Sequence, residues 1–68
     1  MKKYVFEHLV DGGEEILFGT ENEAVKYAMS CGSDCVVVEI DISVDQLARY
    51  RTGVPIPCTT YRHEIWRN

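Results

Sequence analysis

The alternation of hydrophobic and polar residues is clearest in residues 35–42, which read Cys-Val-Val-Val-Glu-Ile-Asp-Ile. Successive side chains of a strand point to opposite faces. One face of this segment is apolar throughout and consists of Val36, Val38, Ile40 and Ile42. The other face begins apolar and turns polar, through Cys35, Val37, Glu39 and Asp41. The pattern predicts the middle strand of a small sheet that is covered on the face carrying Val38.

A β-hairpin is predicted before this strand. Residues 3–10 alternate as a first strand, residues 11–14 (Asp-Gly-Gly-Glu) have the composition of a tight turn, and residues 15–18 return as a second strand. One face of the first strand has the larger apolar area and is our choice for the core side: Tyr4, Phe6, His8 and Val10. Packing of Val5 and Leu9 against a helix is the alternative.

A helix is predicted from about residue 21 to residue 31. Thr20 and Glu23 match a capping box, in which the hydroxyl and the carboxylate satisfy free amides at the helix start. The apolar residues that follow form one narrow stripe of mostly small side chains: Ala24, Val25, Ala28 and Met29. Gly32 is suited to end the helix, since glycine readily adopts positive φ.

The remaining residues predict a short helix and a last strand. Residues 43–46 (Ser-Val-Asp-Gln) are a second capping box and lead into a helix over residues 47–51 that ends before Gly53. Residues 54–57 contain two prolines and are a connector or an edge segment. Residues 59–66 alternate as a strand, with Tyr61, His63 and Ile65 on one face and Trp66 on the other.

The predicted order of elements is therefore β-β-α-β-α-β, in a single α+β domain of residues 1–68. A hairpin followed by a helical crossover places the middle strand antiparallel to the first strand and next to it. We expect a small four-stranded, mainly antiparallel sheet with one main helix packed on one face.

Charge divides the chain into an acidic front and a basic tail. The formal net charge is −4, with ten acids and three bases in residues 1–45 and one acid and four bases in residues 46–68. Hydrophobic residues make up 46% of the chain, but no run approaches a membrane span, and residues 1–10 do not resemble a signal peptide. We expect a soluble, cytoplasmic protein without a membrane partner.

The cysteines are the first candidates for chemistry. Cys31 and Cys35, with Cys58 and His63, could supply a zinc site, and Cys31 could form a disulfide with Cys35. The spacing lacks the two tight ligand pairs of closed zinc sites, so we interpret all three cysteines as packing residues. Cys58 and His63 are five positions apart and lie on opposite faces of a regular strand, which disfavours a thiol–imidazole pair. We therefore predict no enzymatic activity, no metal and no cofactor.

Aromatic residues at strand positions raise the alternative of a small nucleic-acid-binding regulator. Aromatic platforms that stack bases accompany a basic groove. The candidate aromatic residues are Tyr4, Phe6, Tyr61 and Trp66, and the candidate basic residues are Arg49, Arg51, Arg62 and Arg67. The negative net charge opposes binding to phosphates, so this function ranks second.

Our prediction is a non-enzymatic binding protein that occupies a surface of a larger protein. One small-residue helix leaves the opposite sheet face, with Val37 and either Val5 and Leu9 or Trp66, incompletely buried; such a face marks a partner, and a homodimer is left open. The expected partner-binding residues form an acidic rim for a basic or nucleic-acid-binding partner: Glu14, Glu15, Glu21 and Glu23. In length and acidity alone, the chain is similar to small accessory proteins of phages and mobile elements, including anti-CRISPR inhibitors.

Overall fold

The computed structural model describes residues 1–10, 12–57 and 60–68. The order of elements is β-β-α-β-α-β, as the sequence predicts. The elements are β1 (Lys2–His8), β2 (Glu15–Phe18), α1 (Glu21–Cys31), β3 (Cys35–Asp41), α2 (Val44–Arg51) and β4 (Arg62–Arg67). The predicted bounds of β2 and α1 are confirmed, whereas β1 ends two residues earlier than expected. Thr59, at which the last strand was expected to begin, lies outside the described residues.

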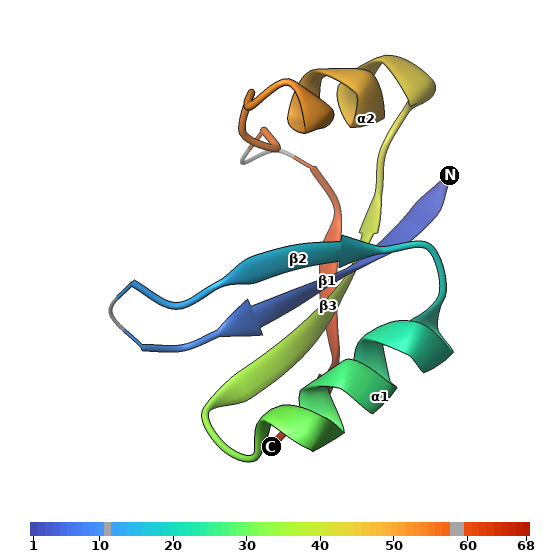
Figure 1. Cartoon of the computed structure of the whole chain (residues 1–68). Helices are drawn as coiled ribbons and strands as arrows, with labels where there is room; N and C mark the ends of the chain where they lie inside the picture. The colour runs from blue at the N-terminus through green and yellow to red at the C-terminus, as the bar shows by residue number, and fades with distance from the viewer. Residues whose placement is uncertain (11, 58–59) are drawn as a thin grey trace.

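The four strands form one antiparallel sheet in the order β2-β1-β3-β4 (Figure 1). The hairpin pairs Phe6 with Ile16, and the crossover through α1 places β3 on the other side of β1, with Phe6 opposite Val37. The predicted α+β class and antiparallel sheet are therefore confirmed. The two outer strands are β2 and β4.

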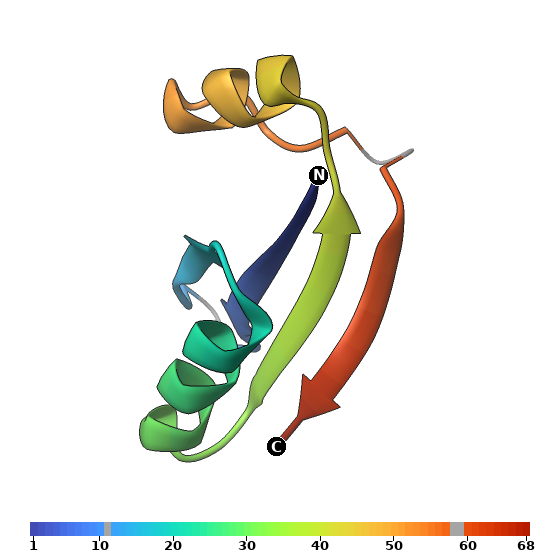
Figure 2. The ribbon, with the colours of Figure 1, turned by 90° about the vertical axis from the view of Figure 1, so that its right-hand side faces the viewer.

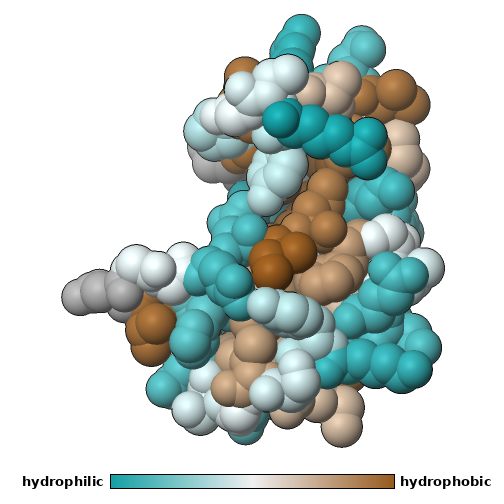
Figure 3. Space-filling view, in the orientation of Figure 1, coloured by the Kyte–Doolittle hydropathy of each residue, from teal (hydrophilic) through white to brown (hydrophobic). Residues whose placement is uncertain are grey.

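The two helices lie on opposite faces of the sheet, with α1 packed mainly over β1 and β3. Figure 1 views the molecule from the β2 edge, with α1 on one side of β2 and α2 on the other. Figure 2 shows β4 at the far edge, away from both helices. In the space-filling view, hydrophobic side chains are visible between the helices, in the middle of the β2 side (Figure 3). The expectation of one main helix on one face is thus approximate, because α2 covers part of the second face.

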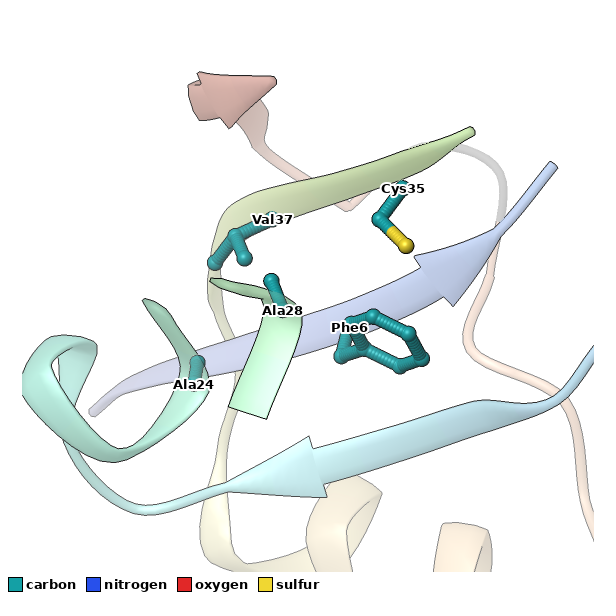
Figure 4. Close-up of a cluster of buried hydrophobic side chains, with 5 residues drawn as sticks. All are labelled: Phe6, Ala24, Ala28, Cys35 and Val37. Carbon is teal, nitrogen blue, oxygen red and sulfur yellow. The ribbon is translucent and has the colours of Figure 1, made fainter. Parts of the chain in front are cut away.

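The first core lies between α1 and the sheet. Its fully buried residues come from β1, α1 and β3: Phe6, Ala24, Ala28, Cys35 and Val37 (Figure 4). Ala24 and Ala28 are four positions apart, so they share one side of the helix. Their small side chains let α1 lie close to the strands, as the predicted stripe implied, but Met29 of that stripe is 64% exposed and takes no part in the contact. The Phe6 ring meets the Tyr27 ring edge to face, with centroids 4.9 Å apart.

The second core lies on the opposite face, under α2 and the connector after it. Val5, Ile40, Ile42 and Leu47 are buried there, against half-buried Val38. The face that carries Val38 is covered, as predicted, but the expectation that the Val37 face is left open was wrong. Val37, expected to be the less buried of the two valines, is fully buried under α1, and the face opposite α1 is covered rather than exposed.

Both predicted helix starts have a capping hydroxyl, but the complete capping box expected at each is present only at α2. The Thr20 hydroxyl accepts a hydrogen bond from the Glu23 amide at 3.3 Å, which satisfies one of the free donors of α1. At α2 the box is complete: Ser43 Oγ accepts from the Gln46 amide at 3.1 Å, and the Gln46 side chain accepts from the Ser43 amide at 2.9 Å. Gly32 follows α1 with φ 94°, a conformation that favours glycine.

A β-bulge in the β3–β4 pair changes the predicted faces of the last strand. The pairing passes from Val37↔Trp66 to Val38↔Glu64, so β4 has one extra residue, Ile65, where β3 advances by a single residue. Trp66 consequently lies on the same face as Val37 and contacts the core under α1. The expectation that Trp66 lies opposite His63 was wrong, because regular alternation does not hold across a bulge.

Candidate functional site

The four glutamates of the expected acidic rim lie at both ends of β2. Glu14 precedes the strand and Glu15 begins it, while Glu21 and Glu23 are in the first turn of α1, after the strand ends. All four are exposed. A four-residue strand is about 13 Å long, so the two pairs are separated along the sheet edge rather than gathered at one point. We call these four residues the acidic flank.

A tyrosine from α1 holds Glu14. The Tyr27 hydroxyl donates to Glu14 Oε1 at 2.6 Å, on the face of the sheet that α1 covers. This hydrogen bond to a carboxylate, together with desolvation, raises the pKa of Tyr27 from 10.0 to about 12. Glu14 remains an anionic acceptor, because a neutral hydroxyl orients its carboxylate without cancelling its charge.

A tyrosine from α2 holds Glu15 on the opposite face. The Tyr50 hydroxyl donates to Glu15 Oε1 at 3.1 Å. Burial and the Glu15 carboxylate raise the pKa of Tyr50. Adjacent residues of a strand point to opposite faces, which explains why neighbouring glutamates contact different helices. Glu15 also lies opposite Glu7 in the β1–β2 register, so this part of the sheet has two acids side by side.

The Tyr27–Glu14 contact predicts a pH dependence. The folded-state pKa of Tyr27 is raised above the unfolded value of 10.0, so its contribution to stability is complete below pH 10.0 and is lost as the pH rises through about 12. The pKa values of Tyr4 and Tyr50 are also raised, but that of Tyr27 is raised the most, so the last step of the tyrosinate absorbance titration should disappear in Tyr27→Phe. Glu14→Gln should move that step to lower pH, because the charge that disfavours tyrosinate is removed. An unchanged titration in Glu14→Gln would show that Glu14 does not set this pKa.

Glu21 and Glu23 have a role within the fold as well as an exposed charge. Both carboxylates are in the first turn of α1, where negative charge is favoured by the helix dipole. The backbone amide of Glu23 is the one that Thr20 caps. These contacts account for acidic residues at the helix start, and they leave the two side chains directed to solvent.

The ion pairs of the described residues lie elsewhere. They join the N-terminal amine to Asp41 at 3.0 Å, Lys2 to Glu39 at 3.1 Å, Arg62 to Glu7 at 3.7 Å and Arg67 to Glu64 at 2.6 Å. All four pairs connect residues of β1, β3 and β4 with one another or with the N-terminus. In this part of the chain, no cation lies within 4 Å of the acidic flank. Among the described residues, its carboxylates therefore have no ion-pair partner.

A second polar cluster, which sequence analysis did not single out, surrounds Glu39. Its carboxylate accepts from Lys2 at 3.1 Å and from the Tyr4 hydroxyl at 3.2 Å, and its side chain is only 15% exposed. The Lys2 hydrogen bond lowers the pKa of Glu39, and the Lys2 ammonium also lies 5.6 Å from the centre of the Tyr61 ring. Each charged side chain of the cluster has a partner. Its contacts connect β1 and β3 with Tyr61, the residue before β4. The register Tyr4↔Glu39 is what brings it together.

The cysteines have different environments. Cys35 is fully buried, and its thiol donates to the Ser33 carbonyl at 3.1 Å, whereas Cys31 is exposed. Burial raises the pKa of the Cys35 thiol, which disfavours the reactive thiolate. Cys58 lies outside the described residues, so its predicted relation to His63 stays a prediction. Among residues 1–10, 12–57 and 60–68, no three His, Cys, Asp or Glu side chains are placed to hold a metal ion.

A small pocket lies between α2 and the connector that follows it. Its volume is about 70 Å³, well below the roughly 300–1,000 Å³ of typical ligand sites. The lining residues are Gln46, Arg49, Val54, Pro55 and Pro57. The pocket has no acid–base pair and is too small to enclose a cofactor. In the described ranges, no helix has the length and apolar character needed to cross a membrane.

The aromatic residues considered for base stacking are mostly part of the core. Phe6 is fully buried under α1, and Trp66 and Tyr4 are half-buried against the same cluster. Tyr61 is 51% exposed and stacks loosely on His63, with ring centroids 6.4 Å apart. Since Phe6 has no exposed ring face, the four residues do not form a common stacking platform.

Comparison of the chain with protein-family models, curated proteins and solved structures found no match.

Proposed function

We propose that this chain is a non-enzymatic binding protein that occupies a basic surface of a larger protein with its acidic flank. The observation that carries the proposal is the distribution of ion pairs. Glu7, Glu39, Asp41 and Glu64 each have a cation within 4 Å, whereas the described part of the chain offers none to the acidic flank. Uncompensated charge on one side of a protein attracts partners of opposite charge and speeds their association.

Local contacts prepare two members of the flank for binding. Tyr27 and Tyr50 orient the Glu14 and Glu15 carboxylates from opposite faces of the sheet. Fewer side-chain rotamers then need to be frozen when a partner binds, which reduces the entropic cost of association. Each carboxylate keeps a second oxygen available to a lysine or arginine.

A basic surface of this kind commonly contacts nucleic-acid phosphates. Covering it would make the chain an inhibitor or accessory protein of a nucleic-acid-binding partner, and we propose that role, of phage or mobile-element type, for it. The carboxylates of the acidic flank, at the two ends of β2, are negatively charged as phosphates are. We do not put forward direct nucleic-acid binding, since the ring of Phe6 is buried and two of the candidate arginines, Arg62 and Arg67, are paired with acids.

The test begins with capture of the partner from the native host and identification by mass spectrometry. With that partner, the double variant Glu14→Lys/Glu15→Lys should lower the association rate about tenfold or more at low salt and weaken its salt dependence. The dissociation rate should change less, because long-range electrostatic attraction acts mainly while the two proteins approach each other.

The matched control is Asp45→Lys/Glu64→Lys, which makes the same change in net charge away from β2. This control should keep most of the association rate. If the acidic-flank variant associates at the original rate at low salt, the flank has no binding role. If both variants slow association equally, overall charge rather than the flank is responsible.

A further inference from the structure

The edges of the sheet differ in their capacity to accept another strand, and this difference identifies the kind of segment that the acidic flank binds. In an antiparallel pair, opposite residues alternate between those that exchange backbone hydrogen bonds and those that do not. The His8 amide donates to the Glu14 carbonyl at 3.0 Å, so the pairs Phe6↔Ile16 and Tyr4↔Phe18 are of the bonded kind.

The intervening residues of β2 therefore present their backbone groups to the open side. These are Glu15 and Leu17, whose N–H and C=O groups point away from β1. Within the described residues, no other hydrogen bond satisfies these groups. The same alternation is consistent across the sheet, since the Leu9 amide donates to Asp34 and the Asn68 amide donates to Cys35.

The β4 edge is protected in ways that the β2 edge is not. A bulge interrupts the register of β4, and its charged residues Arg62, Glu64 and Arg67 lie along that edge. Bulges and edge charges are the usual means of preventing strand addition. β2 has a continuous register with β1 and a single charged residue, Glu15. Its residues Ile16, Leu17 and Phe18 are half-buried, so part of their apolar surface stays accessible at this edge.

We propose that an extended segment with basic side chains, supplied by the partner, adds to β2 as a fifth strand. This inference rests on the proposed function and specifies how the partner is recognised. Backbone hydrogen bonds to Glu15 and Leu17 provide attachment, and the acidic flank selects the charge. Whichever face the basic side chains of the added strand occupy, one of Glu14 and Glu15 lies on that face.

A second copy of the chain suits the same edge less well than a basic segment. The register in which Glu15 and Leu17 of both copies all bond pairs Glu15 of each copy with Leu17 of the other and centres the contact on Ile16. Two Glu15 carboxylates would then lie in diagonal positions about 7–8 Å apart. Like charges at this separation oppose association, so the complementary occupant is a basic segment.

The test uses a short synthetic peptide that alternates lysine and valine, and the same peptide with every internal amide N-methylated. Both carry the same charge, but only the first can donate backbone hydrogen bonds to an edge strand. NMR titration of the intact protein should show that the plain peptide binds about tenfold or more tightly than the methylated one. Hydrogen exchange of the Leu17 amide should slow when the plain peptide is bound.

Variants of Leu17 provide a control on the protein side. Proline at an edge position removes an outward N–H without removing a hydrogen bond to β1. Leu17→Pro should bind the plain and the methylated peptide with similar affinity. Leu17→Ala loses the same apolar side chain but keeps the amide, so it should still bind the plain peptide more tightly. Thermal melts of both variants establish that they are folded, and the peptide pair with the unmodified protein gives the result independently of either variant.

Three results would overturn the inference. Equal binding of both peptides, with unchanged exchange at Leu17, would mean that charge attraction alone acts at this edge, and the proposed function would stand without strand addition. If neither peptide binds, the addition of a basic strand to β2 is rejected as well. Protection of the Leu17 amide that increases with protein concentration, without peptide, would identify a second copy as the occupant.

Discussion

Replacing Phe6 by alanine is expected to cost about 3–5 kcal/mol of unfolding free energy, because the ring is fully buried and its loss leaves a large cavity under α1. A domain of 68 residues has a total stability of only about 3–10 kcal/mol. The variant should therefore be largely unfolded or very close to its unfolding transition. Chemical denaturation followed by far-UV circular dichroism measures the loss.

Two comparisons make the Phe6 result specific. Phe6→Leu keeps most of the apolar volume. It should therefore lose less than half of the unfolding free energy that Phe6→Ala loses, although the edge-to-face contact with Tyr27 disappears. Met29→Ala removes a long side chain from the same domain, but Met29 is 64% exposed and its loss should change the stability by less than about 0.5 kcal/mol. A Phe6→Ala variant that unfolds like the original protein would contradict the placement of α1 over this ring.

The fold was predictable to a large extent because its local signals agree. The Asp-Gly-Gly-Glu sequence of residues 11–14 predicted the hairpin, and Thr20 and Ser43 each cap a helix where the sequence places one. Ala24 and Ala28 correctly predicted which side of α1 faces the sheet, since small residues four positions apart predict close packing on a sheet. Each of these signals depends on residues near one another in the chain.

The errors came from contacts between distant segments. Three consecutive valines in β3 are compatible with burial on both faces, but the alternation beyond them suggested that only one face is covered and that Val37 lies on an open one. Whether α2 returns over the second face depends on the path of the chain after Ile42, which no short motif encodes. The bulge that turns Trp66 toward α1 is likewise determined by pairing with β3.

The candidate site was predictable in composition but not in geometry. The sequence shows four exposed glutamates, and it also contains Tyr27 and Tyr50 at helical positions. That Tyr27 reaches Glu14 and Tyr50 reaches Glu15 follows from the rotation and placement of the two helices. The pairing of Lys2 with Glu39 depends similarly on the β1–β3 register. These contacts decide which acids remain uncompensated, so the acidic flank could be named from the sequence but not distinguished from the paired acids.

Replacing Ile40 by alanine is expected to cost about 2–5 kcal/mol, since Ile40 is fully buried on the face opposite Phe6. β1 and β3 contribute to both cores: Val5 and Ile40 face α2, and Phe6 and Val37 face α1. A single sheet shared by both cores should couple them, so Ile40→Ala should lower the unfolding midpoint of the whole domain in one transition. Amide hydrogen exchange of α1 and α2 distinguishes this from local loosening. Faster exchange confined to α2 would show that the second core is an independent unit and that the sheet with α1 folds without it.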